Sequence, residues 1–248
     1  MLLTSLGIAG WMPSNGHETS TFLVRSFDRA LLLDAGTGVR RLITNPSLLQ
    51  DIRRVDILLS HFHLDHVIGL SYLNALTNIE IGIWGPGASL YGVSTHDVLR
   101  RLLSPPLLAF DITDRIAAVR DVPGGFFQVN GFEVASRYQR QHTSPTLAYR
   151  INDALVYCTD TGYDPGNIGF AHGAQLLLHE AWSATKPVDS GHSTAVEAAE
   201  IAAAANVAQL LLCHLPPNHP APLLRDAARE VFEASDLAEE DTTLSLCQ

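Results

Sequence analysis

The residues from Ser60 to His66 read Ser-His-Phe-His-Leu-Asp-His and gather three imidazoles and one carboxylate in one short segment. Neutral imidazole nitrogen and carboxylate oxygen are ligands that zinc and similar divalent metals favour in proteins. The segment follows the apolar run Val55–Leu59 and precedes a helix-like stretch, so we expect it to be the end of a strand. Ligands at the end of a strand can converge without unfolding the core. The pattern therefore predicts one half of a metal site.

Three more polar residues stand just after apolar runs further along the chain. They are His142, Asp160 and His214, and each follows a predicted strand. A single residue of this kind is more often a solvated side chain or a cap than a ligand. A sheet can present the ends of its strands at one edge, however, so we expect the three side chains to join the HxHxDH segment.

Short apolar runs separated by turn residues predict many strands with helix-like stretches between them. We expect strands at 2–8, 21–26, 30–34, 55–60, 79–84, 115–119, 125–129, 132–139, 147–151, 155–159, 175–179 and 209–214. We expect helices at 38–43, 64–76, 87–102, 194–205 and 222–234. This is the pattern of an α/β protein with layered sheets and outer helices. Neither a repeat nor a low-complexity linker interrupts it, so we expect one domain over residues 1–248.

The helix expected at 194–205 has the clearest start signal. Ser193 or Thr194 can cap its first amides, and Glu197 completes a capping box if Thr194 is the cap. This arrangement puts His192 at the entrance of the helix.

Composition excludes several classes of protein. A hydrophobic fraction of 46% is that of a globular chain, and a formal net charge of −10 with 16 Lys and Arg argues against a general nucleic-acid surface. The three cysteines are widely spaced and do not resemble a disulfide framework. No stretch approaches the ~20 apolar residues of a membrane span, and Met1–Gly10 has no basic signal-peptide region. We therefore expect a cytoplasmic protein with neither nucleic acid nor membrane as a partner.

With these motifs the chain resembles the metallo-β-lactamase superfamily over nearly its whole length. Residues 32–38 look like the early DxG turn of that family, and the HxHxDH segment is followed by single residues in the order His, Asp, His. The resemblance implies a four-layer αβ/βα sandwich with its site at the sheet edges. It also implies two divalent ions: one held by His61, His63 and His142, the other by Asp65, His66 and His214, with Asp160 bridging both.

Within the superfamily, the segments 142–151, 157–161, 179–181 and 191–194 are similar to the ribonuclease Z and phosphodiesterase branch. In that branch a Glu and a His that match Glu180 and His192 assist proton transfer to the leaving oxygen. Thr159 departs from the Gly that usually precedes the bridging Asp. The change keeps the ligand but can alter the local turn, because Gly permits backbone conformations that Thr disfavours.

Two divalent ions, zinc by expectation and manganese as the alternative, would define the chemistry of such a site. Water that bridges two cations has its pKa lowered toward neutrality, and the same cations neutralise charge on a phosphoryl oxygen. Asp65 and Asp160 would keep the ions close by supplying negative charge. His192 could donate a proton to the leaving oxygen if Glu180 holds its other nitrogen. We expect Asp34 to hold the liganding loop by hydrogen bonds rather than to bind metal.

The interval between His142 and Asp160 bears on the substrate. His142 and Asp160 are only 18 positions apart, whereas ribonuclease Z enzymes commonly carry a long tRNA-gripping arm in this interval. With the acidic charge, this favours a small or cyclic phosphodiester over a tRNA 3′ end. Hydrolysis of a lactone or thioester is an alternative, because the same chemistry attacks carbonyl groups. A metal-binding scaffold without turnover is the least favoured interpretation, and a homodimer is left open.

Overall fold

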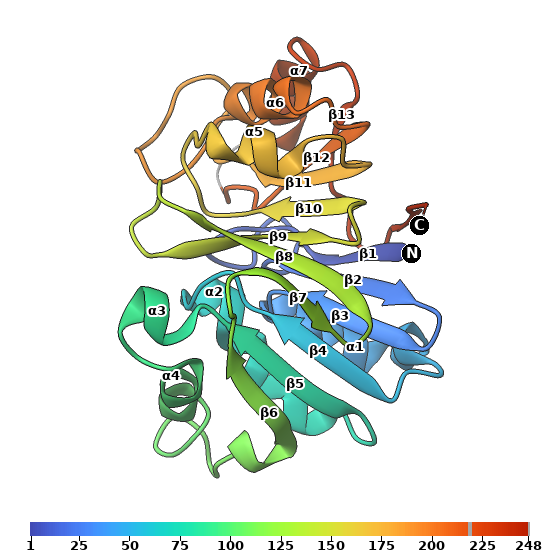
Figure 1. Ribbon diagram of the computed structural model, residues 1–248, viewed down its shortest axis with the longest axis vertical. Helices are drawn as coiled ribbons and strands as arrows, with labels where there is room; N and C mark the ends of the chain where they lie inside the picture. Colours follow the sequence, from blue (N-terminus) through green and yellow to red (C-terminus); the bar gives the residue numbers. More distant parts are fainter. Residues whose placement is uncertain (218–219, 248) are drawn as a thin grey trace.

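The structure is a computed structural model that describes residues 1–217 and 220–247. Two seven-stranded sheets pack face to face, and each carries helices on its outer side (Figure 1). The strand order is β14-β1-β2-β3-β4-β5-β6 in the first sheet and β13-β12-β11-β10-β9-β8-β7 in the second. The expected four-layer αβ/βα sandwich is thereby confirmed.

The first sheet is antiparallel from β1 to β3 and parallel from β3 to β6. Its strands are β1 (Leu2–Gly7), β2 (Thr21–Ser26), β3 (Arg29–Leu33), β4 (Arg54–Leu58), β5 (Glu80–Gly85), β6 (Ile116–Asp121) and β14 (Thr243–Ser245). Parallel neighbours need crossover connections. These contain the α-helices α1 (Arg40–Thr44), α2 (Leu64–Val67), α3 (Gly87–Tyr91) and α4 (Thr95–Leu102) and the 3-10 helices η1 (Thr37–Val39), η2 (Pro46–Leu49), η3 (Ile68–Ala75) and η4 (Thr113–Arg115).

The second sheet repeats this plan, with antiparallel pairing from β7 to β10 and parallel pairing from β10 to β13. Its strands are β7 (Gly125–Val129), β8 (Phe132–Gln139), β9 (Thr146–Ile151), β10 (Leu155–Cys158), β11 (Leu176–Glu180), β12 (Gln209–Cys213) and β13 (Ser235–Leu237). The helices α5 (Gly166–Ala171), α6 (Ala195–Ala204) and α7 (Ala221–Arg229) cover its outer face (Figure 1). The carboxyl ends of the parallel strands therefore share one edge in each sheet.

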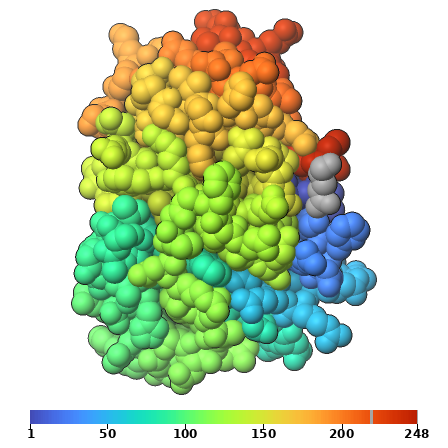
Figure 2. Space-filling view, in the orientation of Figure 1, coloured from blue at the N-terminus to red at the C-terminus, as the bar shows by residue number. Residues whose placement is uncertain are grey.

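Alternation of side chains along the strands divides the core into two layers. Phe22 and Leu31 face the second sheet, whereas Leu23 and Leu32 join the outer cluster beneath the helices. The rings of Phe22 and Tyr157 meet between the sheets, with their centroids 5.6 Å apart. In Figure 2 the yellow-green segment of the chain lies across the middle of the molecule, between the blue and teal half and the orange half. Burial on both faces fixes the register of these strands and so fixes where each one ends.

Each strand expected from the sequence forms within two residues of its predicted bounds, but the expected helices differ more. The helix expected at 222–234 ends at Arg229 as α7, and the stretch expected as one helix at 38–43 is η1 followed by α1. The stretch 87–102 is two helices, because Gly92 ends α3 at a φ of +67° and Ser94 caps α4 by accepting a hydrogen bond from the Asp97 amide. The stretch 64–76 is α2 followed by 3-10 turns. There Gly69 packs so tightly that a Cβ would lie 2.1 Å from the carbonyl oxygen of Gly36. None of the helices in the described residues is long and apolar enough to cross a membrane.

Candidate active site

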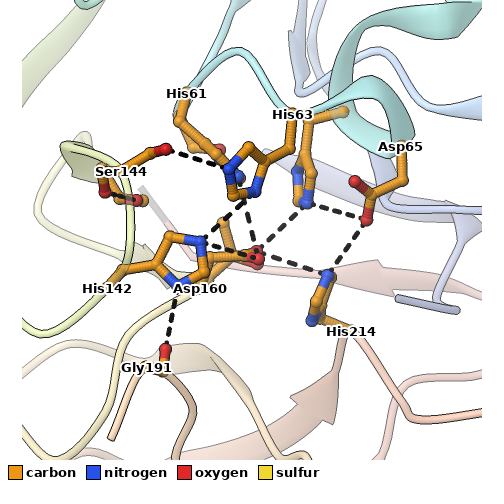
Figure 3. Close-up of polar contacts among 12 residues, drawn as sticks. His61, His63, Asp65, His142, Ser144, Asp160, Gly191 and His214 are labelled. Carbon is orange, nitrogen blue, oxygen red and sulfur yellow. Dashed lines mark hydrogen bonds and ion pairs between the residues drawn. The ribbon is translucent and has the colours of Figure 1, made fainter. Parts of the chain in front are cut away.

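The polar residues of the site follow the carboxyl ends of strands in both sheets. Asp34 follows β3, Asp160 follows the end of β10 and His214 follows β12. All three adopt left-handed backbone conformations, with φ values of +57°, +47° and +49°. Residues other than Gly rarely adopt this region, and it turns the chain sharply at each of these points. Side chains that are far apart in the sequence meet as a result in one cluster (Figure 3).

His61, His63, His142 and Asp160 form the first group of converging side chains. Nδ1 of His63 lies 3.3 Å from Nε2 of His142. Oδ1 of Asp160 lies 3.8 Å from Nε2 of His61 and 3.8 Å from Nε2 of His142. One ligand atom from each residue is within 4.8 Å of all the others.

Asp65, His66 and His214 form the second group. Oδ2 of Asp65 lies 3.3 Å from Nε2 of His66 and 3.3 Å from Nε2 of His214. Oδ2 of Asp160 also faces this group, at 3.1 Å from Nε2 of His66 and 3.4 Å from Nε2 of His214. Asp160 therefore presents one carboxylate oxygen to each group (Figure 3).

In four of the five histidines, the ring nitrogen that points away from the centre contacts another group. Their partners are the Ser60 hydroxyl for His61 at 3.0 Å, the Ser144 hydroxyl for His63 at 3.0 Å, the Asp34 carboxylate for His66 at 2.8 Å and the Gly191 carbonyl oxygen for His142 at 2.9 Å. Such contacts fix the tautomer and the orientation of a metal-binding imidazole. Asp34 also accepts hydrogen bonds from the Ser60 amide and the Tyr157 hydroxyl, which fits the expectation that it holds the liganding loop.

The inward-facing atoms fit divalent cations. Nε2 of His61 and Nε2 of His66 are buried, and neither has a hydrogen-bond partner among the described residues. A buried polar atom without a partner is costly unless something binds it. Tetrahedral ligand atoms at about 2.1 Å from a metal lie about 3.4 Å from one another. The distances given above for pairs of ligand atoms, from 3.1 to 3.8 Å, are close to that value, and all the ligand atoms of each group lie within 4.8 Å of one another.

Burial and charge act against each other in this cluster. Burial lowers the pKa of His61 well below its usual range. Burial acts in the same direction on His66 and His214, but the carboxylates outweigh it and raise both pKa values, that of His214 to about 10. Burial raises the pKa of Asp65 and Asp160, yet the imidazoles outweigh it and hold both well below the usual range. Both carboxylates are therefore anionic and favour a bound cation.

Glu180 and His192 lie beside the two groups. Nδ1 of His192 is 2.8 Å from Oε2 of Glu180, and Glu180 also accepts a hydrogen bond from the Thr161 amide. Burial lowers the pKa of His192, but the hydrogen bond and charge of Glu180 outweigh it and raise the pKa. The expected capping box between Thr194 and Glu197 is present at the start of α6. It fixes the chain just after His192.

Two tryptophans in this region were not anticipated from the sequence. The ring of Trp182 stacks on His192 with centroids 4.8 Å apart and on His214 with centroids 5.3 Å apart. The amide of Trp11 donates a hydrogen bond to Oδ2 of Asp65 over 2.7 Å. Tryptophan is not a ligand type, so ligand spacing could not identify either one. The only signal for Trp182 is its position two residues after Glu180.

A family model described as "Beta-lactamase superfamily domain" matches residues 29–215, which include all of the side chains in both groups. The chain belongs to this superfamily. It is 26% identical to a ribonuclease Z of Prochlorococcus marinus (strain NATL1A) over 99% of both chains. It is also 28% identical to the probable metallo-hydrolase YhfI of Bacillus subtilis (strain 168) over 94% of both chains. The expected membership of the superfamily and the expectation of a hydrolase are confirmed.

Solved structures of the superfamily share the whole fold. The crystal structure of the metallo-β-lactamase fold protein YhfI from Bacillus subtilis has a TM-score of 0.79 at 24% identity and covers 98% of both chains. A diphosphatase from the PhnP family has a TM-score of 0.74 at 18% identity, over 99% of this chain and 98% of the other. These likenesses concern the fold. The roles of the individual side chains as ligands and proton donors stay predictions.

The sequence alignments with members of the superfamily differ in length. The alignment with the ribonuclease Z extends over 323 positions, more than the 248 residues of this chain, whereas that with YhfI extends over 239. The ribonuclease Z therefore carries segments that this chain lacks. The similarity to a protein named ribonuclease Z nevertheless weakens the expectation that this chain has no nucleic-acid partner. RNA is therefore one of the substrates to test.

Proposed function

We propose that this protein is a dinuclear metal-dependent phosphodiesterase that acts on a small or cyclic phosphodiester. The observation that carries the proposal is the shared carboxylate of Asp160, with Oδ1 toward His142 and Oδ2 toward His66 and His214. A carboxylate in this position would hold two cations, and a pair of cations would stabilise negative charge on the attacking and leaving oxygens of a phosphoryl group.

In this proposal each group holds one divalent ion, with zinc expected from the imidazole-rich ligand set and manganese as the alternative. The ligands would be His61, His63 and His142 for the first ion, Asp65, His66 and His214 for the second, and Asp160 for both. When bound, the ions activate water and neutralise charge on the phosphoryl oxygens. Asp65 would contribute a second negative charge, beside that of Asp160, that would help to hold both cations.

His192 is the proposed proton donor to the leaving oxygen. Nδ1 of His192 contacts the Glu180 carboxylate at 2.8 Å. Nε2 of His192 is therefore the nitrogen that would face the substrate. The raised pKa keeps the ring protonated until the leaving oxygen needs the proton. Glu180 is a positioning residue because it acts through His192, and Trp182 limits the rotation of the same ring by stacking.

The size of the substrate is inferred from the interval between His142 and Asp160. The interval contains β9, β10 and the short connections that flank them, so no protruding arm is available there to grip a large RNA. The net charge of −10 also opposes a long polyanion. Cleavage of a tRNA 3′ end is the second candidate, because a relative that aligns over 99% of this chain is named ribonuclease Z.

The test is a substrate panel on zinc-loaded and manganese-loaded protein. It contains bis(p-nitrophenyl) phosphate, 2′,3′-cyclic nucleotides, a precursor tRNA, an acyl-lactone and a thioester. We expect turnover of the small phosphodiesters. Cleavage of the tRNA alone would favour the ribonuclease, and turnover of the lactone or thioester alone would assign a carbonyl hydrolase. No turnover with both metals loaded would leave a metal-binding scaffold.

A further inference from the structure

Trp11 has a strained backbone conformation beside the candidate active site. Its φ is +63°, and the amide of Met12 donates a hydrogen bond to the carbonyl oxygen of Gly10 over 2.7 Å. This contact closes a three-residue γ-turn with Trp11 at its centre. The form of the γ-turn with positive φ is rare and strained, and a bulky residue there is an outlier. Strain of this kind persists where surrounding contacts impose it, and it concentrates at functional sites.

The contacts that impose the turn come from the site itself. The Trp11 amide donates to the Asp65 carboxylate over 2.7 Å. Gly10 packs against the rings of His214 and Trp182 so closely that a Cβ on it would lie 2.6 Å from both rings. The Gly10 amide also donates to the carbonyl oxygen of Leu215 over 2.9 Å. The backbone of Trp11 is therefore fixed directly against the proposed metal ligands.

The indole of Trp11 is left in solvent at this position, with 66% of the residue exposed. Two other apolar side chains, one next to Trp11 and one next to Asp65, are exposed as well. Met12 is 46% exposed, and Leu64, between the proposed ligands His63 and Asp65, is 59% exposed. One exposed apolar residue needs no explanation, but a strained Trp whose amide is bound to the proposed metal ligand Asp65 does. A large rigid ring in such a place is suited to contact a ligand.

We propose that Trp11 stacks on an aromatic ring of the substrate, and that the substrate is a nucleotide phosphodiester whose base lies against the indole. This inference rests on the proposed function and narrows it. Stacking uses the uncharged faces of both rings, so the acidic charge of the chain does not oppose it. Removal of an aromatic side chain that stacks on a base weakens binding by about 5- to 150-fold.

Phe27 provides a matched control within the same chain. It is also an aromatic residue at positive φ, +53°, and it is 89% exposed. It lies in the turn between β2 and β3, at the opposite end of β3 from Asp34. The length of a five-residue strand, about 16 Å, therefore lies between it and the site.

The experiment measures equilibrium binding of AMP and of ribose 5-phosphate to the zinc-loaded protein by calorimetry, because these ligands differ by the base. We expect the wild-type protein to bind AMP at least fivefold more tightly. Trp11→Ala should weaken AMP binding about tenfold and leave both ribose 5-phosphate binding and zinc content unchanged. Trp11→Phe should keep most of the affinity for AMP, and Phe27→Ala should change nothing.

The inference is overturned if the wild-type protein fails to bind AMP or binds both ligands equally, or if Trp11→Ala weakens both to the same extent. These outcomes are separable from the fate of the proposed function. A protein that binds AMP through Trp11 but hydrolyses no phosphodiester would contradict the phosphodiesterase and support the base site. A protein that hydrolyses phosphodiesters but binds AMP and ribose 5-phosphate equally well would support the phosphodiesterase and contradict the base site.

Discussion

The hydroxyl of Thr159 donates a hydrogen bond to Oδ2 of Asp160 over 2.6 Å, and both residues are buried. This is the carboxylate oxygen that faces His66 and His214. Thr159 stands where the resemblance leads us to expect Gly, and its backbone does not need glycine's freedom because the left-handed residue of the turn is Asp160. The substitution therefore adds a donor that orients the proposed bridging carboxylate.

Thr159→Val should weaken binding of the second metal ion. Valine keeps the shape of threonine but cannot donate to Asp160, and loss of a group that orients a ligand lowers metal affinity about 10- to 100-fold. Metal analysis after dialysis against a weak chelator should fall from two ions per chain toward one. Thr159→Ser should retain both ions. Thr21→Val removes another buried hydroxyl, one that donates to backbone carbonyls, and should have no effect on metal content. Equal metal content in Thr159→Val and wild type would contradict this role.

His192→Ala should leave metal content unchanged and slow the reaction according to the leaving group. Loss of a proton donor costs about 10²- to 10⁴-fold when the leaving oxygen is basic. The cost should be only a few-fold for p-nitrophenolate, which departs without a proton. Turnover numbers for an alkyl and a p-nitrophenyl phosphodiester provide the measurement. Equal losses for both substrates would remove the assigned role.

Removal of bound metal should destabilise the fold. The two groups bring several imidazoles and two anionic carboxylates together, and a bound cation would offset the charge of the carboxylates. A ligand at 100 times its Kd stabilises the native state by about 2.7 kcal/mol. The melting temperature should therefore fall on chelation and recover when zinc is added. His61→Ala should abolish most of that recovery, because Nε2 of His61 is one of the buried atoms without a partner in the described chain. A melting temperature that ignores zinc would count against the metal site.

Asp164→Asn should destabilise the protein at neutral pH and much less in acid. Asp164 accepts two hydrogen bonds at 2.9 Å from the guanidinium of Arg137. Burial raises its pKa, but the pairing with Arg137 outweighs it and holds the pKa below the usual value. A lowered carboxyl pKa gives stability above the unfolded-state pKa of about 4, and that stability is lost as the pH falls below this value.

We expect Asp164→Asn to reduce the free energy of unfolding by about 2 kcal/mol at pH 7, with the difference from wild type shrinking toward pH 3. Urea denaturation of both proteins at the two pH values provides the comparison. A difference that stays constant with pH would mean that the carboxylate charge is not what stabilises this position.

The sequence predicts the parts of this protein that depend on local pattern. The central strands are apolar runs because both faces of each sheet are buried there, and Asp160 and His214 are found because each follows an apolar strand. The contacts of Trp11 and Trp182 depend on how loops from separate strands meet, and no spacing encodes that. The elements α5, β13 and β14 were missed because runs of six or three residues are too short to show a period.

Asp34 and Asp160 occupy equivalent places in the two sheets. Asp34 follows β3 and Asp160 follows β10, and each of these strands pairs antiparallel with the strand before it and parallel with the strand after it. Both aspartates have a left-handed φ. Duplication of one ancestral half, followed by pairing of the copies about an approximate twofold axis, would produce this arrangement. The two aspartates would then descend from a single residue, one copy kept as a scaffold for the histidine loop and the other turned toward the cations.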